Sequence, residues 1–469
     1  MNTSDTFSGS SGGSKGVSSA EEQRLQQQQL RRRRIANSLG RRHRGEKIFR
    51  LMGISAVMAG LFFVALLFTS ILARGLPAFW QSTIHTSVFF DPALIDVPTK
   101  PQKKTGESPA AFQEREFAWQ TELGMVNWNR ILENSIVAKK PQLEQSRRDI
   151  RKLFNSDERY HLRDMVVADP SLIGKTVELK FLTDANVDVW LTGKIDRDLP
   201  DDQQQLDPEV RRIADQLKQD GIITREFSTA LFLNADSRSA PASSGLAGAF
   251  IGSLYMMLIV IAISIPIGVA SAIYLEEFAP KNYITDLIEV NINNLAAVPS
   301  IVFGLLGAAI FINWFHFPIS APLVGGLVLS LMTLPTVIIA TRASLKAVPP
   351  SIRQAALGLG ASKMQSVFHH VLPLAIPGIL TGAIIGVAHA LGETAPLLLI
   401  GMKAFVSDIP STPLDQATAL PVQIYLWQGN ELRNFFEPRT AAAIIVLLVM
   451  LIGLNGFAIW LRKKFETRW

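Results

Sequence analysis

The sequence contains no cysteine and few charged residues. Asp, Glu, Lys and Arg together make up 18% of its 469 residues, against 48% hydrophobic residues. The absence of cysteine excludes a disulfide framework, thiolate metal sites and a cysteine nucleophile within this chain. The low charge density and the apolar excess argue against a wholly soluble or disordered chain and favour a membrane protein.

The net charge of +6 comes mainly from the N-terminal end. Residues 1–50 contain eleven Lys or Arg against four acidic residues, including the run from Arg31 to Arg34. Such a composition cannot bury a core and predicts a disordered tail. Nucleic-acid binding is the alternative for an arginine run. Because no aromatic residue is interleaved with these arginines before Phe49, we expect no nucleic-acid partner.

The first apolar segment follows this tail directly. Residues 51–73 carry no charge and would span about 35 Å as a helix, enough to cross a membrane. The long basic tail before the segment and the lack of a clear cleavage site predict an uncleaved transmembrane anchor. The positive-inside rule then places residues 1–50 in the cytoplasm, where the arginines can also contact anionic lipid.

Residues 75–244 are polar and predict a folded α+β domain on the extracytoplasmic side. Alternating apolar residues over 175–182 and 187–191 predict a β-hairpin. A helix is expected over 208–217, with Asp207 as its cap. No metal or catalytic cluster stands out in this segment. We expect three tryptophans of this segment to lie in its core: Trp119, Trp128 and Trp190.

Five further apolar stretches predict, with the first, six membrane spans and both termini in the cytoplasm. The connection over 342–370 is then cytoplasmic too. The acidic residues Glu276, Glu277 and Glu289 show no basic excess around them and give no help with orientation. The five stretches are Leu246–Leu275, Ile292–Phe311, Leu323–Ala340, Val371–Leu391 and Ala441–Leu461.

A short helix is expected inside the 342–370 connection. Ile352, Ala355, Ala356 and Leu359 have the spacing of one helical face, and Gly360 allows the helix to end abruptly. A short apolar helix on the cytoplasmic side suits a groove in another protein. The alternative is a helix that packs back onto the membrane bundle, and periodicity alone does not separate the two.

This connection resembles that of the importer permeases of the ATP-binding-cassette (ABC) superfamily. The resemblance implies a coupling helix that sits in a groove of an ATPase subunit. Two positions depart from the family pattern: Gln354 stands where Glu is usual, and His370 replaces an aliphatic residue. The motif residues are Gln354, Ala355, Ala356, Gly360, Leu372 and Pro373, and the expected coupling helix contains Ile352, Gln354, Ala355, Ala356, Leu359 and Gly360.

Two more stretches, 293–307 and 391–399, resemble phosphate-importer permeases of the PstA type. The resemblance covers about residues 245–469 and leaves out the tail and the domain at 75–244. It implies phosphate as substrate, a second, PstC-type permease subunit, ATPase subunits and an extracytoplasmic phosphate-binding protein. The sequence has no Walker motif, so ATP hydrolysis is expected in a partner, and no cofactor, metal or catalytic residue is expected here.

Glu393, at the outer end of an apolar stretch, is the main candidate for the substrate pathway. The family pattern places arginine four residues earlier, where this chain has His389, and the five later stretches have no Lys or Arg well inside them. Either the partner permease supplies a cation, or His389 is protonated by its neighbour Glu393. Neutral polar residues near helix breaks complete the expected pathway: Asn293, Asn294, Ser300 and Thr394.

The sequence therefore predicts a mainly α, polytopic, six-helix permease of the inner (plasma) membrane with an inserted extracytoplasmic α+β domain. Its expected parts are a basic cytoplasmic tail (1–50), a first span (51–73), the inserted domain (75–244) and a five-span permease domain (245–469). The expected function is ATP-driven phosphate import. Alternatives are a permease for another oxyanion, such as molybdate or phosphonate, or a membrane-anchored sensor or assembly protein. A homodimer stays open beside the heterodimer.

Overall fold

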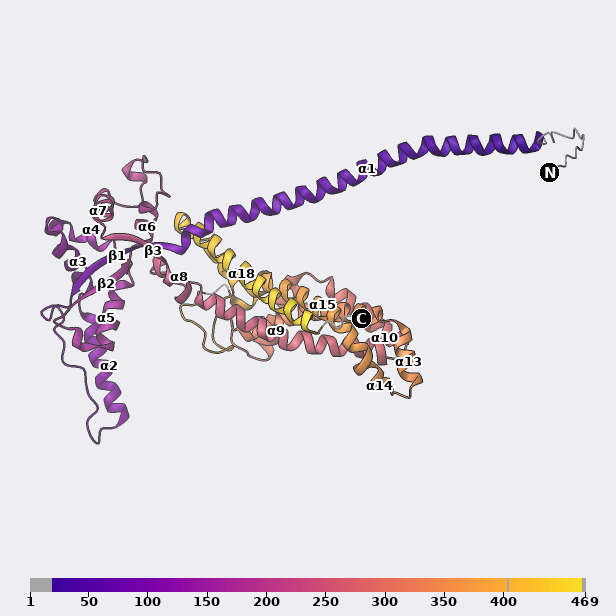
Figure 1. The fold of residues 1–469 in the computed structure, drawn as a ribbon. Helices are drawn as coiled ribbons and strands as arrows, with labels where there is room; N and C mark the ends of the chain where they lie inside the picture. Colours follow the sequence, from indigo (N-terminus) through magenta and orange to yellow (C-terminus); the bar gives the residue numbers. More distant parts are fainter. Residues whose placement is uncertain (1–18, 403–404, 466–469) are drawn as a thin grey trace, which may run out of the picture. The chain divides into compact units, whose positions relative to one another are not determined.

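The computed structural model describes residues 19–402 and 405–465 (Figure 1). Helix α1 (Ser19–Gly75) runs through most of the segment for which we predicted disorder and continues through the first apolar segment. Gln, Arg, Leu and Ala are good helix formers, so the basic part can extend the apolar helix without burying a core. Residues 1–18 of the predicted tail lie outside the described part. Residues 71–469 form a compact unit of their own.

A three-stranded antiparallel sheet forms the centre of the inserted α+β domain. Strand β1 (Trp80–Phe89) lies between β2 (Thr176–Leu182) and β3 (Ile223–Phe227). Ile84 of β1 is fully buried and lies opposite Phe181 of β2 and Ile223 of β3. The helices of the domain are α2 (Pro109–Met125), α3 (Trp128–Lys139), α4 (Arg147–Arg151), α5 (Glu158–Ala168), α6 (Ala185–Leu191), α7 (Pro208–Gln219) and α8 (Thr229–Leu233).

The three tryptophans predicted for the core of this domain are buried, with exposed fractions of 3 to 6%. The predicted hairpin is wrong in its second arm. Asp184 accepts a hydrogen bond from the Asn186 backbone and starts helix α6. Because α6 is buried on nearly all sides, its apolar residues need not follow a helical stripe, and their alternation imitated a strand.

Helix α7 confirms the helix expected from residue 208 onward. The prediction that the Asp207 side chain caps this helix is wrong, however. The Asp207 side chain makes no capping hydrogen bond and pairs instead with Lys152 of the segment after α4. The carboxylate was therefore correctly placed at the start of the helix, but its partner is a distant cation that sequence spacing does not reveal.

After the inserted domain, helices α9, α12, α15 and α18 form most of the membrane part, in which α12 packs against α9 and α15, and α15 packs against α18. Among the described residues, five helices are long and apolar enough to cross a membrane. The helices after the inserted domain are α9 (Ala247–Ile273), α10 (Tyr283–Ala296), α11 (Ser300–Gly307), α12 (Pro322–Ala347), α13 (Pro350–Gly358), α14 (Lys363–Ser366), α15 (Leu372–Gly392), α16 (Ala395–Leu397), α17 (Leu420–Gln428) and α18 (Arg433–Phe465).

One predicted span, over 292–311, is a broken element. Helices α10 and α11 meet at an angle of 102° around Pro299, and counting this bent pair as one span gives up to six. Proline has no backbone N–H and disfavours helical geometry in the residue before it, so the chain turns here. The predicted count of six therefore depends on a pair of half-helices.

Candidate functional site

The short helix predicted in the 342–370 connection is α13. Pro349 and Pro350 occupy its start, where the missing N–H groups cost nothing, and Gly360 has a positive φ of 87° just after its end. Ser362 then forms a capping box with Gln365 and starts α14. The chain thus enters and leaves α13 abruptly, as the glycine and proline spacing indicates.

The predicted apolar face of α13 is divided between the protein interior and solvent. Ala356 is buried, and Ile352 is half-buried against the apolar cluster formed by the ends of α12 and α15. Gln354 and Ala355 are exposed, and Leu359 is 91% exposed. One part of the helix therefore anchors it to the membrane helices while another part stays free. Packing onto the bundle describes Ile352 and Ala356, whereas contact of the exposed part with another protein stays a prediction.

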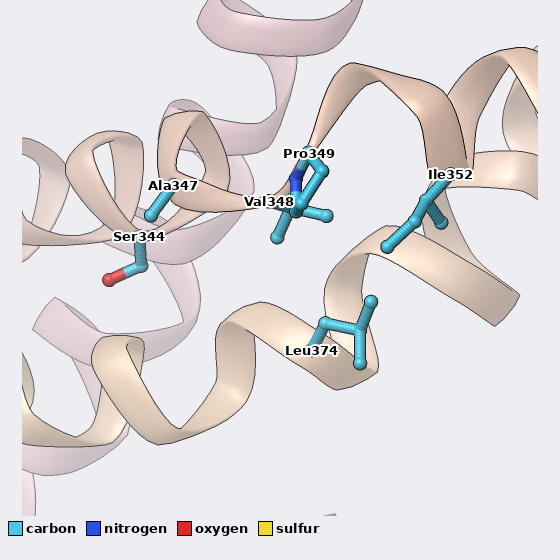
Figure 2. A pocket seen from close by; sticks show the side chains of 6 residues that line it. All are labelled: Ser344, Ala347, Val348, Pro349, Ile352 and Leu374. Atoms are coloured by element: carbon cyan, nitrogen blue, oxygen red, sulfur yellow. The ribbon is translucent and has the colours of Figure 1, made fainter. Parts of the chain in front are cut away.

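A pocket of about 380 Å³ lies between the end of α12, the start of α13 and the start of α15. Figure 2 shows Ile352 of α13 and Leu374 of α15 facing each other across it, with Val348 and Pro349 at the turn between α12 and α13. The lining is mostly apolar, with the Ser344 hydroxyl donating to the Ala340 carbonyl. The pocket lies beside the start of α13, and no charged side chain lines it.

Arg353 ties α13 to the neighbouring helices. Its guanidinium contacts Glu277 at 2.6 Å and donates to the Val348 and Leu345 carbonyls, both at 2.8 Å. The Glu277 side chain is only 8% exposed, so the pair is largely withdrawn from water. Several hydrogen bonds from one guanidinium fix its geometry. Arg353 therefore joins α13 to the end of α12 and to the turn after α9.

A second group of ion pairs involves the acidic residues at 276–289, around which the sequence showed no basic excess. Arg342 of α12 lies 2.9 Å from Glu289 of α10 and 3.3 Å from Glu276, which also lies 3.6 Å from Lys346. These acids pair with cations of the 342–370 connection. The end of α9, the start of α10 and the end of α12 thus lie at one end of the membrane helices. The sequence alone does not reveal these pairs, because the partners of the acids are more than 50 residues away.

His389 and Glu393 are adjacent, as their spacing indicates. The His389 Nε2 atom lies 2.9 Å from a Glu393 carboxylate oxygen at the end of α15. The Glu393 side chain is 17% exposed and that of His389 is 64% exposed, so the imidazole is the more accessible partner. The pair can share a proton or present a cation next to an anion, depending on its protonation state.

The other predicted pathway residues lie at the two breaks of the membrane helices. Asn293 and Asn294 are exposed in the last turn of α10, Ser300 is the half-buried first residue of α11, and half-buried Thr394 precedes α16. A Cβ on Gly304 of α11 would lie 2.7 Å from the Pro396 Cα of α16, so only glycine permits this approach. Helices α11 and α16 are therefore in contact. Within the described residues, no side-chain hydrogen bond joins Asn293 or Asn294 to the His389–Glu393 pair.

The role of Arg439, near the start of α18, was not predicted from the sequence. Its side chain is 3% exposed and donates to the Ser244 carbonyl at 2.5 Å, the Gln81 side-chain oxygen at 2.8 Å and the Ala242 carbonyl at 3.2 Å. The guanidinium also lies over the Phe435 ring at 4.3 Å. Arg439 stands two residues before the predicted span and binds the inserted domain. The available signal in the sequence was the spacing of Phe435 and Arg439, which places the arginine one helical turn after the aromatic ring.

Comparison with known proteins supports the membrane part. Residues 264–469 match the family described as binding-protein-dependent transport system inner membrane component. Residues 36–201 match a family described as a domain of unknown function, DUF3333.

Two curated relatives and one solved structure indicate the range of similarity. The chain is 32% identical to the phosphate transport system permease protein PstA of Yersinia pestis, over 51% of this chain and 80% of that protein. It is 35% identical to the probable ABC transporter permease protein YqgI of Bacillus subtilis, over 36% of this chain and 56% of the relative. A chain of the inward-facing MetNI methionine ABC transporter matches at 17% identity and a TM-score of 0.38, covering 47% of this chain and 95% of that one.

The family match covers the region in which α13 and the His389–Glu393 pair lie, and the PstA relative agrees with the motif resemblance. ABC permeases are membrane subunits without catalytic activity of their own. The chain therefore belongs to the PstA-type permeases within the family of binding-protein-dependent ABC transporter membrane components.

Proposed function

We propose that this chain is the transmembrane permease subunit of an ATP-driven importer of inorganic phosphate. The observation that carries the proposal is α13, which Arg353 and Glu277 fix to the membrane helices while Leu359, Ala355 and Gln354 remain exposed. An exposed helix that is firmly joined to the bundle can transmit the movement of an ATPase subunit. The phosphate assignment rests on the name of the PstA relative and on the 391–399 motif.

The proposed arrangement has six spans, with residues 1–50, the coupling loop at 342–370 and the C-terminus in the cytoplasm. The domain at 75–244 then lies on the extracytoplasmic side, and 245–469 form the permease domain. Basic residues at both ends of the chain and in the loop support this orientation. The partners are a PstC-type permease, two ATPase subunits and an extracytoplasmic phosphate-binding protein. Alternating access moves phosphate along the interface between the two permeases.

In this proposal the anion passes near the break between α10 and α11 and the end of α15. The Glu393 carboxylate alone repels phosphate, so it either accepts a hydrogen bond from a protonated phosphate oxygen or holds His389 as an imidazolium. The 2.9 Å contact between His389 and Glu393 supports the second role. Asn293, Asn294, Ser300 and Thr394 supply neutral donors around freed backbone N–H groups.

Leu359→Asp is expected to lower ATP-dependent phosphate uptake by at least tenfold in proteoliposomes that contain the full complex. A charge at this 91% exposed position opposes burial in an apolar groove of the ATPase. The measurement is uptake together with the amount of ATPase that copurifies. Met364→Asp, at a 63% exposed apolar side chain of the neighbouring helix α14, makes the same change in charge outside α13 and is the matched control.

The same proteoliposomes test the function as a whole. Phosphate uptake that molybdate and phosphonate do not inhibit supports the proposal. Preferential uptake of either competitor would assign the importer to another oxyanion. A complex with no ATP-driven flux and no copurifying ATPase would contradict the transport function and favour a sensor or assembly protein.

His389→Ala is expected to reduce phosphate uptake about tenfold or more, because it leaves the largely shielded Glu393 carboxylate without its cationic partner. His389→Arg, which supplies a permanent cation at the same position, should retain uptake. The measurement is the initial rate of uptake. Wild-type uptake by the alanine variant would show that the pair has no part in transport.

A further inference from the structure

A cavity of about 460 Å³ lies in the inserted domain, away from the membrane helices that carry the proposed pathway. Its walls come from α3, from α4 and the turn after it, and from the start of α5. Helices α3, α4 and α5 also pack around a buried apolar core, which fixes the positions of these walls.

The cavity is lined by four cations and one acid. Arg148 and Arg151 lie one turn apart on α4, Lys152 follows them, and Arg159 projects from α5, against Glu133 of α3. The lining therefore carries a net charge of about +3. Arginine guanidinium groups present fixed arrays of N–H donors that match the geometry of a phosphate group.

Most of this positive charge is not neutralised by neighbouring acids. Lys152 pairs with Asp149 and Asp207, and Glu133 lies 3.6 Å from Arg130 outside the cavity lining. Within the described part of the chain, no acid lies within ion-pair distance of the three lining arginines. Burial raises the pKa of the Asp157 carboxyl while the charge of Arg159 acts against that shift, so Asp157 offsets part of the charge of Arg159 but not that of Arg148 or Arg151.

Two polar atoms of the lining residues are buried and lack a hydrogen-bond partner within the described residues. The first is Nε of Arg159, whose terminal nitrogen donates to the Tyr160 hydroxyl at 2.7 Å. The second is Oδ1 of Asn155, a residue only 2% exposed, whose amide nitrogen donates to Ser243. A buried donor or acceptor without a partner costs free energy, so such atoms mark a place where a ligand can complete the bonding.

We propose that this cavity binds an oxyanion of the phosphate type. The anion accepts hydrogen bonds from Arg159 and from the arginines of α4, and a protonated phosphate oxygen donates to Asn155 Oδ1. Sulfate, which carries no proton at neutral pH, leaves that acceptor unpaired and should bind more weakly. The alternative is a solvated basic face, because Arg148, Arg151 and Lys152 are exposed; such a face would bind phosphate and sulfate equally.

Free phosphate and the phosphate of a lipid headgroup share this chemistry. The choice of inorganic phosphate as the first probe rests on the proposed function. The inference that the cavity binds an oxyanion does not depend on that function. Glycerol 3-phosphate serves as a soluble probe for the headgroup. Tenfold tighter binding of glycerol 3-phosphate than of inorganic phosphate would identify lipid as the source, and the reverse order would identify the free ion.

The experiment is equilibrium dialysis of radiolabelled phosphate against the purified full-length chain in nanodiscs of neutral lipid. Arg151→Gln and Arg159→Gln are each expected to weaken binding at least tenfold, and the double variant to remove it. Arg163→Gln is the matched control, because Arg163 lies on the same helix α5 and pairs with Asp164 at 2.7 Å, outside the cavity lining. Thermal unfolding of each variant shows that the domain is still folded.

Phosphate binding that is unchanged in folded Arg151→Gln and Arg159→Gln variants would overturn the inference, as would equal affinity for phosphate and sulfate. Neither result affects the proposed import function, which is measured separately as uptake by the complete complex. Conversely, normal binding in the cavity with no phosphate uptake by the complex would refute the import function alone.

Discussion

Arg353→Ala is expected to abolish phosphate uptake by the reconstituted complex and to lower the free energy of unfolding by about 3–5 kcal/mol. The substitution leaves the Glu277 carboxylate, 8% exposed, without its cation and removes the donors to the Val348 and Leu345 carbonyls. Breaking one half of a buried ion pair is costly because the remaining charge has lost its hydration. Helix α13 would also lose its rigid connection to α12. Uptake rates and the thermal unfolding midpoint of the detergent-solubilised chain measure the two effects.

Lys346→Ala is the control for this prediction. Lys346 lies 3.6 Å from Glu276, but its side chain is 56% exposed, and an exposed pair of this kind contributes about 0–1 kcal/mol. A double variant, Arg353→Met with Glu277→Met, removes both charges and should unfold at a higher temperature than Arg353→Ala. If Arg353→Ala transports and unfolds like the wild type, the pair does not position the coupling helix.

Arg439→Met is expected to destabilise the inserted domain and the outer end of α18 together, by at least about 2 kcal/mol. The Ser244 carbonyl is fully buried and loses its hydrogen-bond donor, and loss of a bond from a charged donor costs about 1.5–3 kcal/mol. The other two acceptors keep one donor each, since the Gln81 amide donates to Ala242 and Ser228 donates to Gln81. The measurements are the unfolding midpoint and the rate at which protease cleaves residues 76–244.

The stability of Arg439→Lys should lie between that of Arg439→Met and that of the wild type, because one ammonium group cannot reproduce the planar array of guanidinium donors. Arg433→Ala is the control on the same helix, where an exposed arginine is expected to change stability by less than about 0.5 kcal/mol. A methionine variant with wild-type stability and protease resistance would mean that the arginine does not hold the domain to α18.

Features set by local sequence could be predicted. The apolar stretches became helices α9, α12, α15 and α18, the proline and glycine spacing bounded α13, and the i,i+4 spacing brought His389 to Glu393. Each of these depends on residues within a few turns of one another. The family resemblance rested on the same local motifs.

Features set by distant contacts could not be predicted. The strand-like alternation in α6 arose because the helix is buried on nearly all sides, so period alone did not identify it. The acids at 276–289 pair with Arg342, Lys346 and Arg353, which lie 53 to 76 residues further along the chain. Arg439 contacts Gln81 across 358 residues, a pairing that only the folded chain shows.

The contact between Arg439 and the inserted domain also limits how the chain can be shortened. The guanidinium of α18 finds its acceptors in Gln81, Ala242 and Ser244, all of which belong to or border the insertion. A minimal permease made by deleting residues 76–244 would lose all three acceptors and uncover this face of α18. The insertion and α18 therefore have to be redesigned together in any shortened chain.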